Sequence, residues 1–259
     1  MTEQIAISAT DLEVRYGETV ALTGVDIAVR KGSILSVIGP NGAGKSAFLK
    51  ALAGTVKPFS GKVKCKGASP SFVLQSTDVD RSLPISVREV VSLGRYSEIG
   101  LFRRFSKTDH DIIDQALQRM GVEELKNNQF HDLSGGQQQR VLIAQGLVQE
   151  TETLLLDEPV NGLDITSREI ILNTIFEEVD KGRTIIFTTH DLNHARLSDE
   201  VLLLNTCPCC VGVPEEVLTE TNLRDAYGDS HIHLGDELLL DDPHHTHTSS
   251  HNKKGIRNF

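Results

Sequence analysis

The chain has 259 residues and a formal net charge of −10, because 36 acidic side chains outnumber 26 lysines and arginines. A chain of this length can bury a full hydrophobic core, and it suits one globular unit followed by a short tail. The acidic balance argues against a nucleic-acid surface, since phosphate backbones are bound by clustered lysine and arginine.

The sequence opens with no basic segment leading into an apolar stretch, and it contains no apolar run long enough to span a bilayer. We therefore expect a cytoplasmic protein whose contacts with a membrane run through a protein partner. The four cysteines do not form the framework of a secreted disulfide protein, so we expect reduced thiols.

The first predicted elements are strands. Residues 12–14 and 19–29 alternate between apolar and polar side chains, and Tyr16 and Gly17 lie between the two segments. This pattern predicts an antiparallel β layer near the N-terminus.

A phosphate-binding loop follows. Residues 33–38 predict a buried strand, residues 39–46 have the GxxxxGK[ST] pattern, and residues 44–53 predict a helix. In such a loop the backbone amides, the lysine and the hydroxyl hold phosphates and Mg²⁺, which here assigns Lys45 and Ser46. The alternative is a glycine turn that binds no ligand.

Residues 76–130 break the alternation of strands and helices and predict a helical insert. Residues 108–111 supply a cap and an acidic first turn for a helix that ends at Gly121. Gln75 lies directly before this insert, after a short apolar run.

Residues 133–137 read Leu-Ser-Gly-Gly-Gln and predict the start of another helix. Ser134 can cap that helix, Gln137 stands at its third position, and the two glycines let a ligand approach exposed backbone amides. We expect a second anion site here.

Three later apolar runs, residues 154–156, 184–188 and 201–204, predict buried parallel strands. Apolar residues recur at helical spacing between Asp164 and Gly182, which predicts a crossover helix between the first two of these strands. The fold class is therefore α/β with a parallel-sheet core.

Polar residues follow two of these strands. Asp157 ends the first strand, where a carboxylate has little structural use, and Glu158 beside it could polarise a water molecule or could be a solvated carboxylate. A lone histidine is usually structural, but His190 follows a buried strand in a Phe-Thr-Thr-His-Asp context that favours a functional role. His194 is interpreted as structural.

The C-terminal part is unusual in composition. Residues 229–259 are rich in histidine and acidic side chains and predict a mostly disordered tail, which could bind a metal such as zinc or could simply be solvated. Cys207, Cys209 and Cys210 could also bind metal. Their spacing is not a C-x₂-C pair, so a reduced loop is the favoured interpretation.

In this order, the motifs of residues 8–228 resemble the ATP-binding subunits of ABC transporters. The resemblance implies a P-loop NTPase fold of the ABC type over residues 1–228, with a parallel-sheet core, an N-terminal antiparallel β layer, and a helical subdomain at about 76–150. It also implies ATPase activity with ATP and Mg²⁺ as cofactors.

The resemblance assigns roles residue by residue. Tyr16 would stack on adenine, although a packed edge-strand tyrosine is the alternative. The expected phosphate contacts are Gly39, Pro40, Asn41, Gly42, Ala43, Gly44, Lys45, Ser46 and Ala47. The expected Mg²⁺ ligands are Ser46, Gln75 and Asp157, and the expected catalytic residues are Lys45, Gln75, Glu158 and His190, with Glu158 as general base. In a head-to-tail homodimer Ser134, Gly135, Gly136 and Gln137 would close on the partner's ATP, and Asp164 would link the two sites.

Residues 79–104 and 214–228 are similar to the ATPases of bacterial zinc, manganese and iron importers. This similarity implies an energy-coupling subunit on the inner face of the cell membrane, attached to integral-membrane permease subunits and, through them, to an extracytoplasmic metal-binding protein. An ATPase for siderophore or haem uptake is the alternative. A non-transport ABC ATPase acting on ribosomes or DNA is disfavoured by the acidic charge and the compact insert.

Three residues depart from the family pattern. Ala47 replaces the usual hydroxyl residue and is expected to weaken nucleotide binding without abolishing it. Gln145 and Gly146 stand where Arg-Ala is common.

Overall fold

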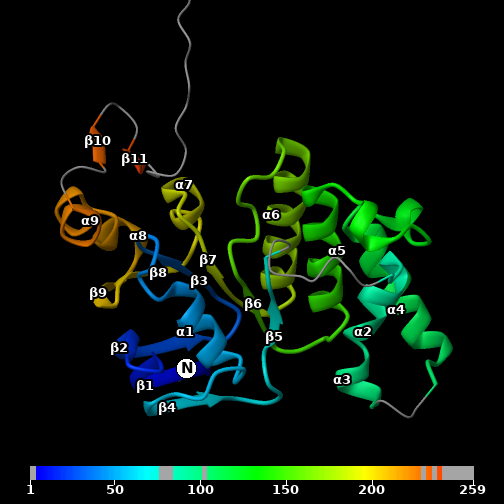
Figure 1. Ribbon diagram of the computed structural model, residues 1–259, viewed down its shortest axis with the longest axis horizontal. Helices are drawn as coiled ribbons and strands as arrows, with labels where there is room; N and C mark the ends of the chain where they lie inside the picture. Colours follow the sequence, from blue (N-terminus) through cyan, green and yellow to red (C-terminus); the bar gives the residue numbers. More distant parts are fainter. Residues whose placement is uncertain (1–3, 76–83, 101–103, 229–231, 235–237, 241–259) are drawn as a thin grey trace, which may run out of the picture.

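A six-stranded sheet forms the centre of the computed structural model, which describes residues 4–75, 84–100, 104–228, 232–234 and 238–240 (Figure 1). The strands in their order across the sheet are β5 (Ser71–Val73), β6 (Thr153–Leu156), β7 (Thr184–Thr188), β3 (Ile34–Ile38), β8 (Glu200–Asn205) and β9 (Cys207–Gly212). The first five are parallel, as predicted for the buried apolar runs, and β9 pairs antiparallel with β8.

The two faces of this sheet belong to different hydrophobic cores. Along β6, the side chain of Leu155 packs in one cluster, whereas Leu154 and Leu156 pack in the other. Along β7, Ile186 and Ile185 divide in the same way. Because successive side chains of a strand point to opposite faces, consecutive apolar residues are needed where both faces are covered, as in Leu154–Leu156 of β6 and Ile185–Phe187 of β7.

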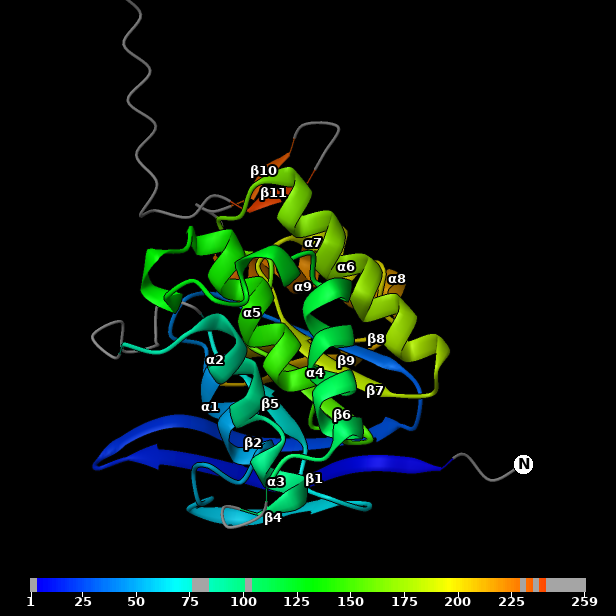
Figure 2. The ribbon, with the colours of Figure 1, turned by 90° about the vertical axis from the view of Figure 1, so that its right-hand side faces the viewer.

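The first face carries α1 (Lys45–Leu52) and a three-stranded antiparallel sheet of β1 (Ile5–Tyr16), β2 (Thr19–Arg30) and β4 (Ser60–Cys65), in the order β2-β1-β4. Both views place this layer below the central sheet (Figures 1 and 2). Buried and exposed residues alternate along β2 from Val25 to Val29. The predicted N-terminal β layer is thereby confirmed.

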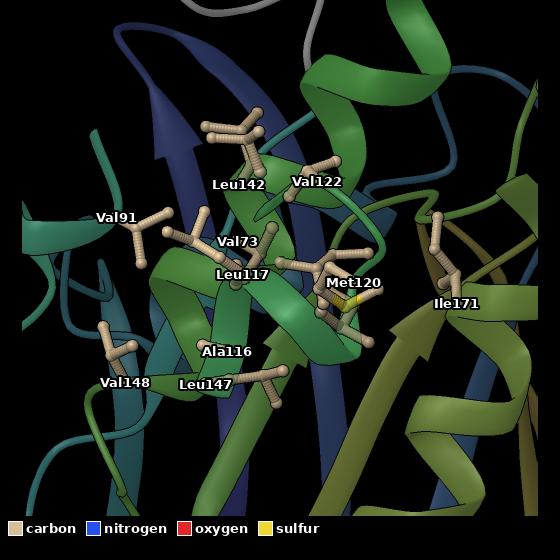
Figure 3. Close-up of a cluster of buried hydrophobic side chains, with 14 of the residues drawn as sticks. Val73, Val91, Ala116, Leu117, Met120, Val122, Leu142, Leu147, Val148 and Ile171 are labelled. Atoms are coloured by element: carbon tan, nitrogen blue, oxygen red, sulfur yellow. The ribbon is translucent and has the colours of Figure 1, made fainter. Parts of the chain in front are cut away.

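The second face carries the helical subdomain. Its elements are α2 (Val87–Leu93), α3 (Tyr96–Ile99), α4 (Lys107–Arg119), the 3₁₀ turns Glu123–Leu125 and Phe130–Asp132, and α5 (Gly135–Leu147). Apart from α3, these helices and α6 (Ile165–Asp180) bury one continuous cluster, in which Leu117 of α4 and Leu142 of α5 lie close to Val73 of β5 (Figure 3). Burial of each large side chain of this kind contributes about 1.5–3 kcal/mol.

Capping boxes set the starts of α2 and α4. Ser86 caps α2 with Glu89, and Ser106 caps α4 with Asp109. The sequence-based start of α4 at residues 108–111 was therefore two residues late, because the Ser106 hydroxyl, rather than Thr108, accepts the amide proton of the third helical residue. The predicted end is correct, since Gly121 follows the helix with a left-handed φ of 61°.

The cysteine segment is a strand and not a loop. Cys207 to Gly212 form β9, which pairs with β8 and shifts register between Leu203 and Leu204. Pro208 is compatible with this position because β9 lies at the edge of the sheet, where a missing backbone donor costs little. Proline is depleted in strands, and Pro208 lies within this short segment, which is why the residue pattern did not predict a strand here.

The C-terminal part contains α7 (Leu192–Ala195), α8 (Pro214–Val217), α9 (Glu220–Tyr227) and an antiparallel hairpin of β10 (Ile232–Leu234) and β11 (Leu238–Leu240). The rest of the predicted tail, residues 229–231, 235–237 and 241–259, lies outside the described residues, as do residues 79–83 and 101–103 of the segment 79–104. Within the described ranges, none of the helices has the length and apolar character needed to cross a membrane.

Candidate functional site

The phosphate loop connects the end of β3 to the start of α1. Gly39 has a φ of 152°, and a β-carbon there would lie 2.1 Å from the carbonyl oxygen of Leu204. Gly44 caps α1 with a φ of 95°, and a β-carbon there would lie 2.4 Å from the carbonyl oxygen of Ala21. Glycine is therefore required on both sides of the loop. At Gly42 a β-carbon would meet nothing within 4 Å, so the loop has open space at its tip.

Lys45 is buried in the floor of this loop. Its Nζ donates to the carbonyl oxygens of Gly39, at 2.7 Å, and Pro40, at 3.1 Å. These bonds hold the ammonium group inside the loop, where the N-terminus of α1 also favours an anion. Ser46 is exposed beside it, and Ala47 packs inward in the core.

The two acidic residues after β6 are held by Thr188 at the end of β7. The hydroxyl of Thr188 donates to Asp157 Oδ1 at 2.6 Å and accepts the backbone N–H of Glu158 at 2.7 Å. Asp157 is 4% exposed, and Glu158 is half-buried. The adjacent carboxyl ends of two parallel strands thus present both carboxylates at one edge of the sheet.

Glu158 and His190 share a cavity of about 50 Å³. The side-chain amide of Asn161 donates to Glu158 Oε2 at 2.7 Å, so the Glu158 carboxylate has a fixed partner on one side. His194 lines the same cavity and is buried. Burial lowers the pKa of His194 and favours its neutral form, although Asp191 nearby acts in the opposite direction.

The predicted second anion site is a well-formed helix start. Ser134 Oγ accepts the backbone N–H of Gln137, and Gln137 Oε1 accepts the backbone N–H of Ser134 at 2.9 Å. Ser134 and Gly135 are exposed, and a β-carbon at Gly135 would meet nothing within 4 Å. The first turn of α5 is therefore accessible to a ligand.

The side chain of Asp164 packs against the start of α5. It caps α6 by accepting the backbone N–H of Ser167 at 2.8 Å and the hydroxyl of Ser167 at 2.8 Å. These hydrogen bonds lower the pKa of the Asp164 carboxyl. A β-carbon at Gly136 would lie 2.8 Å from Asp164 Oδ2, so the two segments pack without space for a larger residue.

The structure separates the two predicted phosphate-binding ends. α1 packs in the cluster on one face of the central sheet, and α5 packs in the cluster on the other face. Lys45 and Ser134 therefore stand at the starts of helices that pack on opposite faces of the central sheet. By contrast, Thr188 links Asp157 to Glu158, and Glu158 and His190 line one cavity.

Tyr16 and Gln75 lie at the borders of elements. Tyr16 ends β1 and is 50% exposed, which is not the environment of a packed edge-strand tyrosine and leaves its ring available to a ligand. Gln75 follows β5 by two residues, directly before the undescribed residues 76–83, and is half-buried.

Two of the residues that complete the site were not identified from the sequence. Thr188 and Asn161 hold the acidic pair by hydrogen bonds. A buried polar residue in the last position of a strand whose central residues are apolar, as at Thr188, is the signal that could have indicated one of them.

A larger cavity of about 480 Å³ lies away from this site, near the amino ends of β6 and β7. Its charged groups pair with one another: Arg183 bonds Glu178 at 3.0 Å, and Arg119 bonds the same carboxyl at 2.8 Å. Among the described residues, no cluster of three or more histidine, cysteine or acidic side chains is arranged to hold a metal ion.

Comparisons with known proteins find a matching family and similar chains. A family model described as ABC transporter matches residues 22–161. The manganese transport system ATP-binding protein of Halalkalibacterium halodurans is 39% identical over 198 residues, which cover 74% of this chain and 79% of that protein. The chelated iron transport system membrane protein YfeB of Yersinia pestis is 35% identical over 218 residues, which cover 80% of this chain and 74% of that protein.

A solved structure of an inward-facing, metal-chelate type ABC transporter contains a similar chain. It is 31% identical, has a TM-score of 0.78, and the match covers 86% of this chain and 89% of that chain.

Proposed function

Since the chain belongs to the ABC transporter family, we propose that it is the ATP-hydrolysing, energy-coupling subunit of an importer for a divalent metal cation. The observation that carries the ATPase assignment is the meeting of Asp157 and Glu158 with His190 at the carboxyl edge of the sheet. In open α/β sheets this edge is where ligands bind.

The residues of the loop fit a nucleoside triphosphate. Gly39 and Gly44 give the backbone its path, Lys45 is fixed inside the loop, and Tyr16 has an exposed ring that can stack on a base. Lys45 contributes a point charge to the β and γ phosphates. Ser46 and Ala47 follow at the first turn of the helix.

The oxygen donors at the site also fit Mg²⁺, which prefers hard oxygen ligands. A hydroxyl from Ser46, a carboxylate from Asp157 and an amide oxygen from Gln75 form such a set, and the hydrogen bond from Thr188 already orients the carboxylate. The chemistry supplied by bound Mg²⁺ is neutralisation of the charge on the phosphates.

Glu158 is the general base in this proposal. Its carboxylate accepts a proton from the attacking water, while the bond from Asn161 to Oε2 restricts its rotation. His190 lies in the same cavity and contacts the γ-phosphate. This contact holds the γ-phosphate in line between the attacking water and the departing ADP. Lys45 and Gln75 complete the catalytic set.

A complete site requires two chains, because α1 and α5 lie on opposite faces of one sheet. In the homodimer, Ser134, Gly135, Gly136 and Gln137 of one protomer bind the ATP held by Lys45 of its partner. Asp164, which packs against Gly136, links the second site to the first. ATP binding closes the dimer, and hydrolysis reopens it.

The dimer binds permease subunits at the inner face of the cell membrane and drives their conformational change. Through the permease it is coupled to an extracytoplasmic metal-binding protein. The proposed cargo is manganese or zinc. The relatives named for manganese and for metal chelates support a divalent metal, and the relative named for chelated iron makes iron the alternative cargo.

The cargo is tested in cells that lack the gene. Expression of the wild-type chain is expected to restore cellular manganese or zinc, measured by mass spectrometry, whereas expression of Lys45→Ala is not. Unchanged manganese and zinc with a loss of siderophore-bound iron would support the alternative importer class instead.

A further inference from the structure

Thr188, the last residue of β7, joins the two acidic residues of the site through one hydroxyl group. This hydroxyl accepts the Glu158 N–H at 2.7 Å and donates to Asp157 Oδ1 at 2.6 Å. A threonine hydroxyl has a single proton, so both bonds can form together only in this direction. The side chain is fully buried, and bulk water does not compete for either bond.

The backbone at Glu158 explains why such a partner is needed. Glu158 has a φ of 44°, a left-handed conformation that a non-glycine residue rarely adopts. The N–H of Asp157 still bonds to the carbonyl oxygen of Val73 at 3.1 Å, as in a strand, whereas the next N–H turns to Thr188. The hydroxyl therefore meets the chain at the point where it leaves the sheet.

We propose that Thr188 is a positioning residue for ATP hydrolysis, whose hydroxyl sets the direction of the Asp157 carboxylate and the place of Glu158 at the same time. This inference rests on the ATPase function proposed above. Thr188 acts through its two neighbours, and neither bond requires it to touch the nucleotide.

Substitutions at Thr188 separate this role from simple packing. Thr188→Val keeps the shape of the side chain but removes the hydroxyl, which leaves a buried N–H and a buried carboxylate oxygen without this partner. Thr188→Ser keeps the hydroxyl and removes a methyl group. The matched control is Thr153→Val in the neighbouring strand β6, since Thr153 is 2% exposed and its hydroxyl has no hydrogen-bond partner among the described residues.

Two measurements on the full chain test the proposal. In steady-state ATPase assays, Thr188→Val is expected to lower kcat by about 10- to 100-fold, the usual effect of removing a partner that orients a ligand, with little change in the KM for ATP. Hydrogen exchange followed by mass spectrometry, on the nucleotide-free protein, is expected to show faster exchange of the Glu158 amide. Thr188→Ser is expected to restore both values, and Thr153→Val to change neither.

Several results would overturn the proposal. They are an unchanged kcat in Thr188→Val, an unchanged exchange rate at Glu158, or a loss in Thr188→Ser as large as that in Thr188→Val. If Thr188→Val does not fold, the pair Thr188→Ser and Thr188→Cys decides, because the two side chains are similar in size but the thiol is a weak donor and acceptor. Equal kcat in that pair would contradict the positioning role.

If the proposed ATPase function is wrong, the same experiments give a different set of results. A wild-type protein without ATPase activity would reject the enzyme assignment, while the exchange of the Glu158 amide would still report on the hydroxyl bridge. An active wild type with an equally active Thr188→Val would reject only the role of Thr188.

Discussion

Glu158 combines a strained backbone with a well-anchored carboxylate. Its left-handed φ costs about 1–2 kcal/mol relative to the ordinary conformation, yet its N–H and its Oε2 each have a short hydrogen bond. Strain of this kind persists where surrounding bonds over-determine it, and functional sites are the usual places.

We predict that Glu158→Gln stops turnover but not ATP binding. The amide side chain can still accept the bond from Asn161, but it cannot take a proton from water, so kcat is expected to fall by about 100-fold or more. Trapped ATP should hold a dimer that is visible by light scattering. Glu169→Gln, exposed on α6, is the control. Near-normal hydrolysis by Glu158→Gln would remove Glu158 as the base.

The start of α4 is an element whose stability depends on pH. Hydrogen bonds from the hydroxyl and N–H of Ser106, and then the guanidinium of Arg95, lower the pKa of Asp109 to about 2. The unfolded value is about 3.9. The ionised carboxyl therefore stabilises the folded protein above about pH 4, and this contribution is lost as the pH falls through 2.

We accordingly predict that Asp109→Asn lowers the melting temperature at pH 7, and that its difference from the wild type shrinks between about pH 4 and pH 2. The measurement is thermal unfolding followed by circular dichroism across this range. Asp111→Asn, exposed on the same helix, is the control. A difference for Asp109→Asn that stays constant down to pH 2 would contradict the prediction.

The packing of α5 on β5 explains one departure from the family pattern. A β-carbon at Gly146 would lie 2.5 Å from Val73 Cγ2, so glycine permits the close approach of helix and strand. The main-chain oxygen of Gly146 also accepts a bond from the buried Arg183 at 3.2 Å. The structure gives no corresponding reason for Gln145.

Gly146→Ala is expected to destabilise the protein by about 1–3 kcal/mol, because the added methyl overpacks this contact. The free energy of unfolding is measured with urea. Gly135→Ala, where a β-carbon meets nothing within 4 Å, is the control for stability. The double variant Gly146→Ala with Val73→Ala should recover part of the loss; additive losses would place the strain elsewhere.

Elements that depend on neighbouring residues could be predicted from the sequence. Contacts between residues far apart in the chain could not. The buried strands β3, β6 and β7 and the cap of α5 follow from neighbouring residues, and the structure confirms them. The bridge from Thr188 to the acidic pair joins residues about thirty positions apart, and no periodicity reports it. The strand β9 was missed because pairing with β8, and not residue preference, decides its conformation.

At the scale of the whole molecule, we predict that the exposed start of α5 controls dimer formation. Ser134→Arg, introduced into the Glu158→Gln variant, should abolish the ATP-dependent dimer, since a large side chain would occupy the place of the partner's nucleotide. Light scattering with and without ATP measures this. Glu124→Arg, exposed in the same subdomain, is the control, and a dimer that survives Ser134→Arg would refute the head-to-tail arrangement.

The placement of α1 and α5 on opposite faces of one sheet has a consequence for kinetics. A lone chain holds both halves of a site but cannot join its own halves, so hydrolysis is expected to be second order in protein at concentrations below the dimer dissociation constant. Halving the protein would then lower the rate about fourfold rather than twofold, as mass action requires. Permease subunits that hold two copies side by side would supply that concentration, and cassettes not yet assembled would leave the cell's ATP untouched.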